Sequence, residues 1–108
     1  MEAFEIGPLT AQQKQTGKAY LEFLRMPSLS MGVYHLPVGG IDPQSPHSED
    51  EVYHVVDGKS QIRVGDEDRW VGAGSIVFVA AHVPHRFHTI EEDLTVLVFF
   101  APAEYSQA

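Results

Sequence analysis

The chain has 108 residues, which is enough for one domain and too few for two. Hydrophobic residues make up 44% and charged residues 20%, an ordinary balance for a folded globular domain, so extensive disorder is not expected. Acidic residues number 15 against 7 Lys and Arg, which gives a formal net charge of -8, and the basic residues are scattered singly. We therefore expect no nucleic-acid partner and no binding to an anionic membrane surface.

Cysteine is absent, which excludes disulfides, thiolate nucleophiles and cysteine-based metal sites. The N-terminal ten residues are acidic and lack a long apolar run, so they do not fit a secretory signal, and no apolar run is long enough for a membrane span. A cytoplasmic protein is therefore the expectation. The unusual residue is histidine, with six copies, five of them between positions 47 and 88.

The N-terminal region carries one helix signal and one ambiguous segment. Thr10, with Gln13 three residues later, fits a capping box for a short helix over residues 11–16, which Gly17 would end. Residues 19–25 alternate weakly between apolar and polar side chains, which fits either a strand or a helical turn. The region therefore predicts a short helix or an extra strand ahead of the main domain.

From residue 31 onwards the sequence has the pattern of short strands. Asp57 and Gly58 form a strong signal for a two-residue hairpin turn, and residues 91–93 predict another turn. The expected strands are 31–36, 51–56, 59–64, 69–71, 75–79, 85–90 and 94–100. No helical period of useful length follows residue 30, so an α/β sheet is excluded and an all-β sandwich or barrel is expected.

Two stretches with regular spacing stand out. The first, GGIDPQSPHSEDEVYHVVDG over residues 39–58, and the second, GSIVFVAAHVPHRFHT over residues 74–89, resemble the two motifs of the cupin superfamily. Those motifs are G-x5-H-x-H-x3/4-E-x6-G and G-x5-P-x-G-x2-H-x3-N. Ser45 stands at the first histidine position, and Ala80, His82 and Thr89 stand for the proline, glycine and asparagine of the second motif.

This resemblance implies a double-stranded β-helix, or jelly-roll barrel, over residues 31–103, followed by a flexible tail at 104–108. The family's metal ligands carry over as His47, Glu51 and His85. Two imidazoles and one carboxylate form an open ligand set that suits Fe, Mn, Zn or Ni as the divalent ion.

Strand alternation gives directions for the side chains around this site. Glu51 shares a face with Tyr53, and His85 shares a face with Phe87, so these side chains should point into the barrel. Candidates for the pocket wall are Tyr53, Phe78 and Phe87, and Tyr53 is also a candidate proton donor. Candidates for an extra ligand or a polar pocket group are Gln44 and Ser45.

Each ligand candidate also has a simpler interpretation. His47 could be a surface loop residue, Glu51 could belong to a solvated acidic cluster, and His85 could be a hydrogen-bonded core histidine. Three functions therefore stay open: a metal-dependent enzyme of the dioxygenase, isomerase or lyase type acting on a small molecule, a non-catalytic small-ligand-binding or sensing module, and a purely structural barrel.

The apolar residues of segment 1–30 have no place inside such a barrel. We expect this segment to pack on the barrel or to supply part of an apolar interface in a homodimer, because a lone barrel leaves edge strands that need to be covered.

Overall fold

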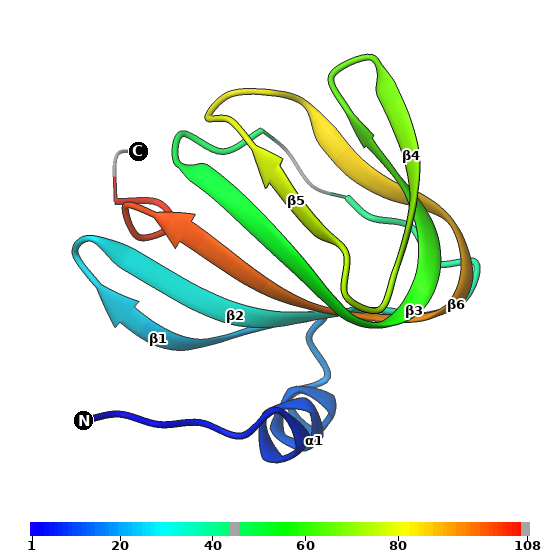
Figure 1. The fold of residues 1–108 in the computed structure, drawn as a ribbon. Coiled ribbons are helices and arrows are strands. Elements are labelled where there is room, and N and C mark those ends of the chain that lie inside the picture. The colour runs from blue at the N-terminus through cyan, green and yellow to red at the C-terminus, as the bar shows by residue number, and fades with distance from the viewer. Residues whose placement is uncertain (44–45, 107–108) are drawn as a thin grey trace.

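The computed structural model describes residues 1–43 and 46–106. Its elements follow in the order α1 (Ile6–Thr16), β1 (Tyr20–Met26), β2 (Leu29–Leu36), β3 (Asp50–Val64), β4 (Glu67–Gly72), β5 (Ile76–Val79) and β6 (His85–Ala101). The protein is thus mostly β, with one short N-terminal helix, as the sequence predicts. Figure 1 shows the helix lying beneath a strongly curled sheet.

The curl comes from two long strands that bend together. β3 and β6 pair antiparallel from Asp50 opposite Ala101 to Val64 opposite His85, with register irregularities between Val55 and Gln61. Bulges of this kind bend a strand and increase its twist. The first half of β3 also pairs with β5 and its second half with β4, while β6 pairs with β2 and β2 with β1. The sheet therefore wraps around one apolar core, whose most buried members include Tyr53, Val55, Ile62, Phe87 and Leu94.

The prediction of a hairpin turn at Asp57 and Gly58 is wrong, because both lie inside β3. Gly58 has φ of +104°, and a Cβ built there would lie 2.3 Å from the carbonyl oxygen of Asp93 in β6. The glycine is needed for a close approach of two backbones at the bend, not for a chain reversal. The predicted turn at residues 91–93 is wrong for the same reason, since they continue β6 through this bend.

The N-terminal helix begins earlier than predicted. Its N-cap is Glu5, which makes no side-chain cap hydrogen bond, and the hydroxyl of Thr10 donates to the carbonyl of Gly7 inside the helix. The predicted capping box is therefore wrong: Thr10 bonds backwards along a helix that has already started. Gly17 ends the helix in the left-handed conformation, with φ of 70°, as predicted. Leu9 and Gln13 form its buried face.

The end of the chain is held against the barrel as far as it is described. The backbone N–H of Glu104 donates to the Ser30 hydroxyl over 2.9 Å, and that of Tyr105 donates to Oε1 of Glu49 over 3.0 Å. Residues 104–106 thus form a turn held by these bonds, residues 107–108 lie outside the described part, and the flexible tail expected at 104–108 stays a prediction. Across residues 1–43 and 46–106, none of the helical structure combines the length and apolar character that a membrane crossing requires.

Candidate metal centre and cavity

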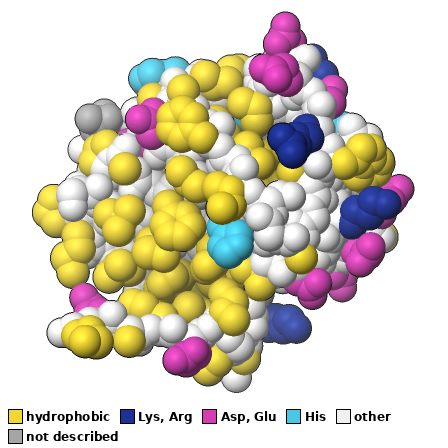
Figure 2. Space-filling model, viewed as in Figure 1, with side chains coloured by type: hydrophobic (Ala, Val, Ile, Leu, Met, Phe, Trp, Pro, Cys, Tyr) yellow, Lys and Arg dark blue, Asp and Glu magenta, His cyan; other side chains and the backbone are white. Residues whose placement is uncertain are grey.

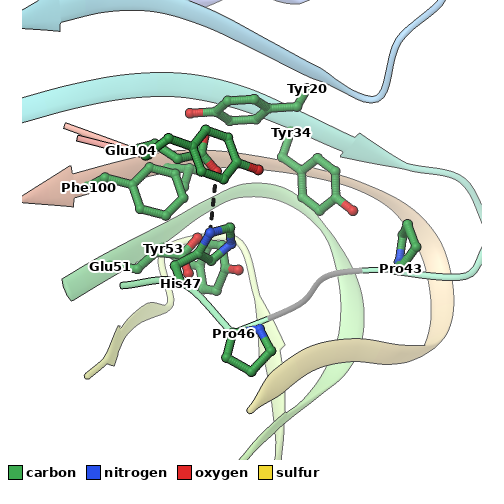
Figure 3. A pocket seen from close by; sticks show the side chains of 11 residues that line it. Tyr20, Tyr34, Pro43, Pro46, His47, Glu51, Tyr53, Phe100 and Glu104 are labelled. Atoms are coloured by element: carbon green, nitrogen blue, oxygen red, sulfur yellow. Dashed lines mark ion pairs between the residues drawn. The ribbon is translucent and has the colours of Figure 1, made fainter. Parts of the chain in front are cut away.

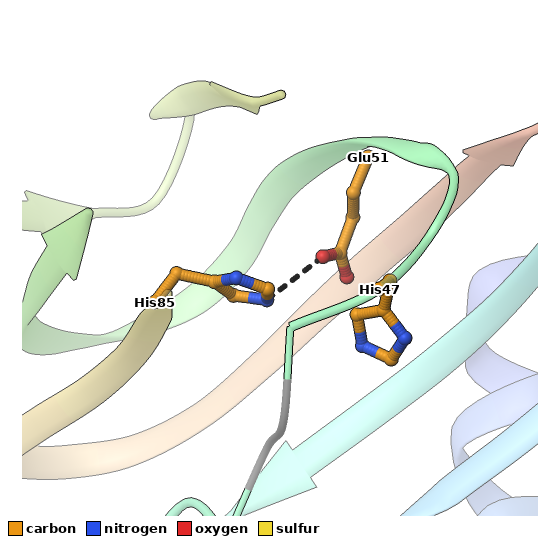
Figure 4. Close-up of side chains that lie close together, drawn as sticks. All are labelled: His47, Glu51 and His85. Carbon is orange, nitrogen blue, oxygen red and sulfur yellow. Dashed lines mark ion pairs between the residues drawn. The ribbon is translucent and has the colours of Figure 1, made fainter. Parts of the chain in front are cut away.

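Three side chains from separate parts of the sequence meet inside the barrel. His47 lies in the loop before β3, Glu51 is the second residue of β3, and His85 is the first residue of β6. One ligand atom from each lies within 4.8 Å of the other two. Figure 4 shows the three side chains converging. The alternation predicted for both strands is observed, because Glu51 and Tyr53 are buried together on β3, as are His85 and Phe87 on β6.

The environment of Glu51 suits a ligand of a cation. Its side chain is only 2% exposed. Among the described residues, no group donates a hydrogen bond to Oε1 of Glu51, although Nε2 of His85 lies 2.9 Å away. A buried carboxylate oxygen is costly unless it is paired or bound to a metal. The site therefore fits a cation that Glu51 and His85 would share.

The ring of His85 is oriented by its other nitrogen. Nδ1 lies 2.9 Å from the backbone carbonyl of Val83, which can only accept a hydrogen bond, so Nδ1 carries a proton and Nε2 faces Glu51. Burial lowers the pKa of His85, but the Glu51 carboxylate and the Val83 carbonyl outweigh it, so the pKa is raised overall. A proton and a metal ion thus compete for the same position between Nε2 and Glu51.

The ring of His47 lies beside a carboxylate that the sequence analysis did not identify as part of the site. Nδ1 of His47 is 3.4 Å from Oε2 of Glu104, and both side chains are nearly buried. Burial, followed by the nearby His85, lowers the pKa of His47 against the opposing effect of Glu51. The ring also packs edge-on against Phe100, with ring centres 4.8 Å apart. Packing and the carboxylate together restrict its orientation.

Hydrogen bonds hold both Asp42 and His47, two described residues of the stretch before β3. The Tyr34 hydroxyl donates to Oδ1 of Asp42 over 2.6 Å, and the backbone N–H of Phe87 donates to Oδ2 of Asp42 over 2.9 Å. The backbone N–H of His82 donates to the carbonyl of His47 over 2.6 Å. These bonds join Asp42 to β2 and β6, and they join His47 to the turn before β6.

Beside the three ligands lies a cavity of about 380 Å³ (Figure 3). His47 and Glu51 form part of its wall, together with Glu104. The rest is mainly aromatic and apolar, and includes Tyr20, Tyr34, Tyr53, Val98, Phe100 and Tyr105. Among the described residues that line it there is no lysine or arginine. This volume suits a small molecule at the low end of the usual range for ligand sites.

Of the three predicted pocket residues, only Tyr53 lines the cavity. Phe87 lies behind it in the core, with ring centres 4.9 Å apart. Phe78 is 60% exposed on the outer face, because Val77 and Val79 are the inward residues of β5. Phe78 and Phe87 are therefore not among the described residues that line this cavity, and Phe78 lines the outer groove instead. Gln44 and Ser45 lie outside the described residues, so their role as extra ligands stays a prediction.

Glu104 is the functional candidate that the sequence analysis missed. Burial, and then the negative charges of Glu51, Glu22 and Glu49, raise its pKa to about 7. No spacing rule links a residue beyond the last strand to His47, which lies 57 positions earlier. Its position follows only from where β6 ends and how the next turn is anchored.

The fold is that of a small cupin domain. The sequence model of the Cupin domain family matches residues 32–100, so the chain belongs to the cupin family. The backbone supports the motif alignment, since His82 and Thr89 have φ of 67° and 52°. These are the positions where the family motif has glycine and asparagine, the residues that adopt such angles most readily.

Particular relatives extend the comparison. An uncharacterized protein of Streptomyces coelicolor, SCO3923, is 49% identical over 104 residues, which cover 96% of this chain and 99% of that protein. The structure of TT1209 from Thermus thermophilus matches with a TM-score of 0.75 at 23% identity, covering 95% of this chain and 99% of that one. KdgF from Halomonas sp. matches with a TM-score of 0.70 at 21% identity, covering 77% and 76%. At these identities the solved structures show a shared fold.

Proposed function

We propose that the protein is a metal-dependent enzyme that acts on a small molecule bound in the barrel. The observation that carries this proposal is the buried group of His47, Glu51 and His85, in which Oε1 of Glu51 has no hydrogen-bond donor among the described residues. A solvated acidic cluster would not bury the Glu51 side chain to 2% exposure beside two imidazoles.

His47, Glu51 and His85 are the residues that would hold the ion, with Fe, Mn, Zn and Ni all compatible with this ligand set. A bound ion of this kind would polarise a substrate oxygen as a Lewis acid. These residues would offer the ion two neutral imidazoles and one carboxylate, and a molecule in the adjoining cavity would lie next to them.

The cavity wall supplies hydroxyl groups that can donate protons. Burial raises the pKa of both Tyr20 and Tyr34 well above the usual range, so their hydroxyls stay protonated. The Tyr34 hydroxyl is engaged by Asp42, whereas the buried Tyr20 hydroxyl has no hydrogen-bond partner among the described residues. Tyr53 lines the cavity, and its ring centre is 6.0 Å from that of His85, so we assign it the role of a proton donor.

The reaction class stays open among dioxygenase, isomerase and lyase chemistry. A lyase is supported by the DMSP lyase DddQ from Ruegeria pomeroyi DSS-3, which shares the fold with a TM-score of 0.69 at 22% identity, over 81% of this chain and 49% of that chain. The absence of lysine and arginine from the described cavity wall favours a substrate without a large negative charge.

A non-catalytic module that binds a small ligand is the second candidate. The open cavity supports it, because a cavity of this size can hold a ligand without turning it over. Metal-loaded protein separates the two candidates: an enzyme consumes a member of a small-molecule panel, with or without O2 uptake, whereas a binding module raises its melting temperature with that molecule and leaves it unchanged.

The metal site itself is tested by measuring bound metal in protein purified without an affinity tag. We expect about one ion per chain in the wild type, and strongly reduced binding in Glu51→Gln and His85→Ala, which remove ligands. His54→Ala is the matched control, since His54 lies on the same strand and faces the outer groove. Equal metal content in all four proteins would contradict the proposed site.

We also propose that the protein forms a homodimer in the cytoplasm through its outer apolar face. An outer groove is lined by residues that include Leu29, Val52, Ile76, Phe78 and Phe99. Figure 2 shows hydrophobic side chains gathered over this side of the molecule. Ile76 and Phe78 are 71% and 60% exposed on β5, which pairs only with β3 within the described sheet. A second copy suits this face, because twofold pairing covers an apolar patch on both chains at once.

A further inference from the structure

The turn that follows β6 brings the Glu104 carboxylate against the ring of His47, and the ring turns its Nδ1 atom toward that carboxylate. Oε2 of Glu104 lies 3.4 Å from Nδ1 of His47. Figure 3 shows this ion pair at the edge of the cavity, and Figure 4 shows one ring nitrogen of His47 turned toward the other two ligands and one turned away. Because Nδ1 faces Glu104, Nε2 is the nitrogen on the side of Glu51 and His85.

The second histidine has the same arrangement. Nδ1 of His85 lies 2.9 Å from the carbonyl of Val83, and its Nε2 faces Glu51. Each imidazole of the site therefore has a pure acceptor beside Nδ1, a backbone carbonyl in one case and a carboxylate in the other. Outer acceptors of this kind fix the tautomer and the orientation of metal-bound histidines.

The backbone of Glu104 is held firmly enough for this role. Its N–H donates to the Ser30 hydroxyl over 2.9 Å, and its carbonyl accepts a hydrogen bond from the guanidinium of Arg25 over 2.7 Å. The next residue, Tyr105, donates its N–H to Glu49 over 3.0 Å. These bonds tie the turn to β1, to β2 and to the loop before β3, so the Glu104 side chain, only 12% exposed, is directed at His47.

We propose that Glu104 is a positioning residue for the metal centre: its carboxylate accepts a hydrogen bond from Nδ1–H of His47 and so presents Nε2 to the ion. This proposal rests on the metal site of the proposed function. The C-terminal turn would thus orient a metal ligand through Glu104, although Glu104 itself does not bind the ion.

The test is a zinc titration with a competing chelator on wild type, Glu104→Ala, Glu104→Gln and the control Glu22→Gln. Removal of an outer acceptor costs about 10- to 100-fold in metal affinity, which we expect for Glu104→Ala. Glu104→Gln keeps an acceptor oxygen and should recover much of this loss. Glu22→Gln removes a nearby negative charge and its pairing with Arg25 but leaves the acceptor beside His47 in place, so it should bind zinc more tightly than Glu104→Ala.

Wild-type affinity in folded Glu104→Ala would overturn the proposal. So would equal losses in Glu104→Ala and Glu104→Gln, because charge alone would then explain the effect. If the wild type does not bind zinc, the proposed metal site fails, and a second measurement still decides the role of Glu104.

That measurement is the tautomer of His47 in metal-free protein at pH 8, read from long-range correlations between ring protons and ring nitrogens in 15N-histidine-labelled samples. We expect the proton on Nδ1 in the wild type and on Nε2, the form favoured by free imidazole, in Glu104→Ala. An Nε2 proton in the wild type, or the same tautomer in both proteins, would overturn the positioning role, whereas a merely structural role for Glu104 would leave the tautomer unchanged.

Discussion

The backbone N–H of His82 donates a hydrogen bond of 2.6 Å to the carbonyl oxygen of His47. This bond links the turn between β5 and β6 to the loop before β3, so the second motif directly holds a ligand of the first. His82 makes the bond with φ of 67°, a left-handed angle that a glycine adopts without strain.

His82→Gly should therefore keep the bond and remove the strain. We expect its free energy of unfolding to exceed that of His82→Ala by about 1 kcal/mol, because alanine is strained in the left-handed conformation and glycine is not. Urea denaturation of the two variants measures the difference. If His82→Ala were the more stable, the left-handed conformation at this turn would be excluded.

Gly58 lies at the bend of β3, where its φ is +104° and a Cβ would lie 2.3 Å from the Asp93 carbonyl oxygen. Gly58→Ala should lower the free energy of unfolding by about 2 kcal/mol or more, because strain and a backbone clash combine. Gly72→Ala is the control: its Cβ would lie 3.5 Å from the nearest atom. Equal effects of the two substitutions in denaturant titrations would contradict a close approach at the bend.

The raised pKa of Glu104, about 7, makes stability depend on pH in the metal-free protein. The unfolded chain releases this proton near the ordinary value of 4.5, so the folded state binds more protons between the two values. Stability from this group is therefore highest in acid, falls as pH rises through this window, and stays low above pH 7.

Glu104→Gln removes this penalty. In the presence of chelator, we expect its melting temperature to exceed that of the wild type at pH 8, and the gap to shrink as the pH falls toward 5. Scanning calorimetry at several pH values measures both curves. A gap that is constant with pH would show that Glu104 does not titrate differently in the folded state.

We expect the exposed apolar residues on the outer face of β5 to form the interface of a homodimer. Light scattering of the wild type should give twice the chain mass of 12.0 kDa, and Phe78→Asp should give the monomer mass, because it places a charge in an apolar contact. Val38→Asp, at a residue that is 57% exposed in a loop, is the control and should remain a dimer. A monomeric wild type at micromolar concentration would exclude this interface.

Local patterns were enough to predict a mostly β fold, and the resemblance to the cupin motifs implied His47, Glu51 and His85 as ligands. Glu51 and His85 lie at the start of strands in which buried and exposed residues alternate, so their inward direction can be predicted from the sequence. The resemblance to cupins supplied the pairing of the two motifs, which no local pattern contains.

The errors arose where tertiary contacts decide the structure. Asp57–Gly58 is a common turn signal, but a glycine is also needed where two bent strands approach closely, and the sequence does not distinguish these uses. Phe78 is strongly apolar, yet the pleat of β5 places it outside. Glu104 enters the site only because the turn after β6 is anchored to Ser30 and Arg25.

The central claim is that His47, Glu51 and His85 bind one metal ion. A crystal structure of the metal-loaded protein, with anomalous data collected above and below the absorption edge of the added metal, tests it most directly. We expect one anomalous peak within bonding distance of Nε2 of His47, a carboxylate oxygen of Glu51 and Nε2 of His85. A fully loaded crystal with no peak there, or with its metal held by other residues, would contradict it.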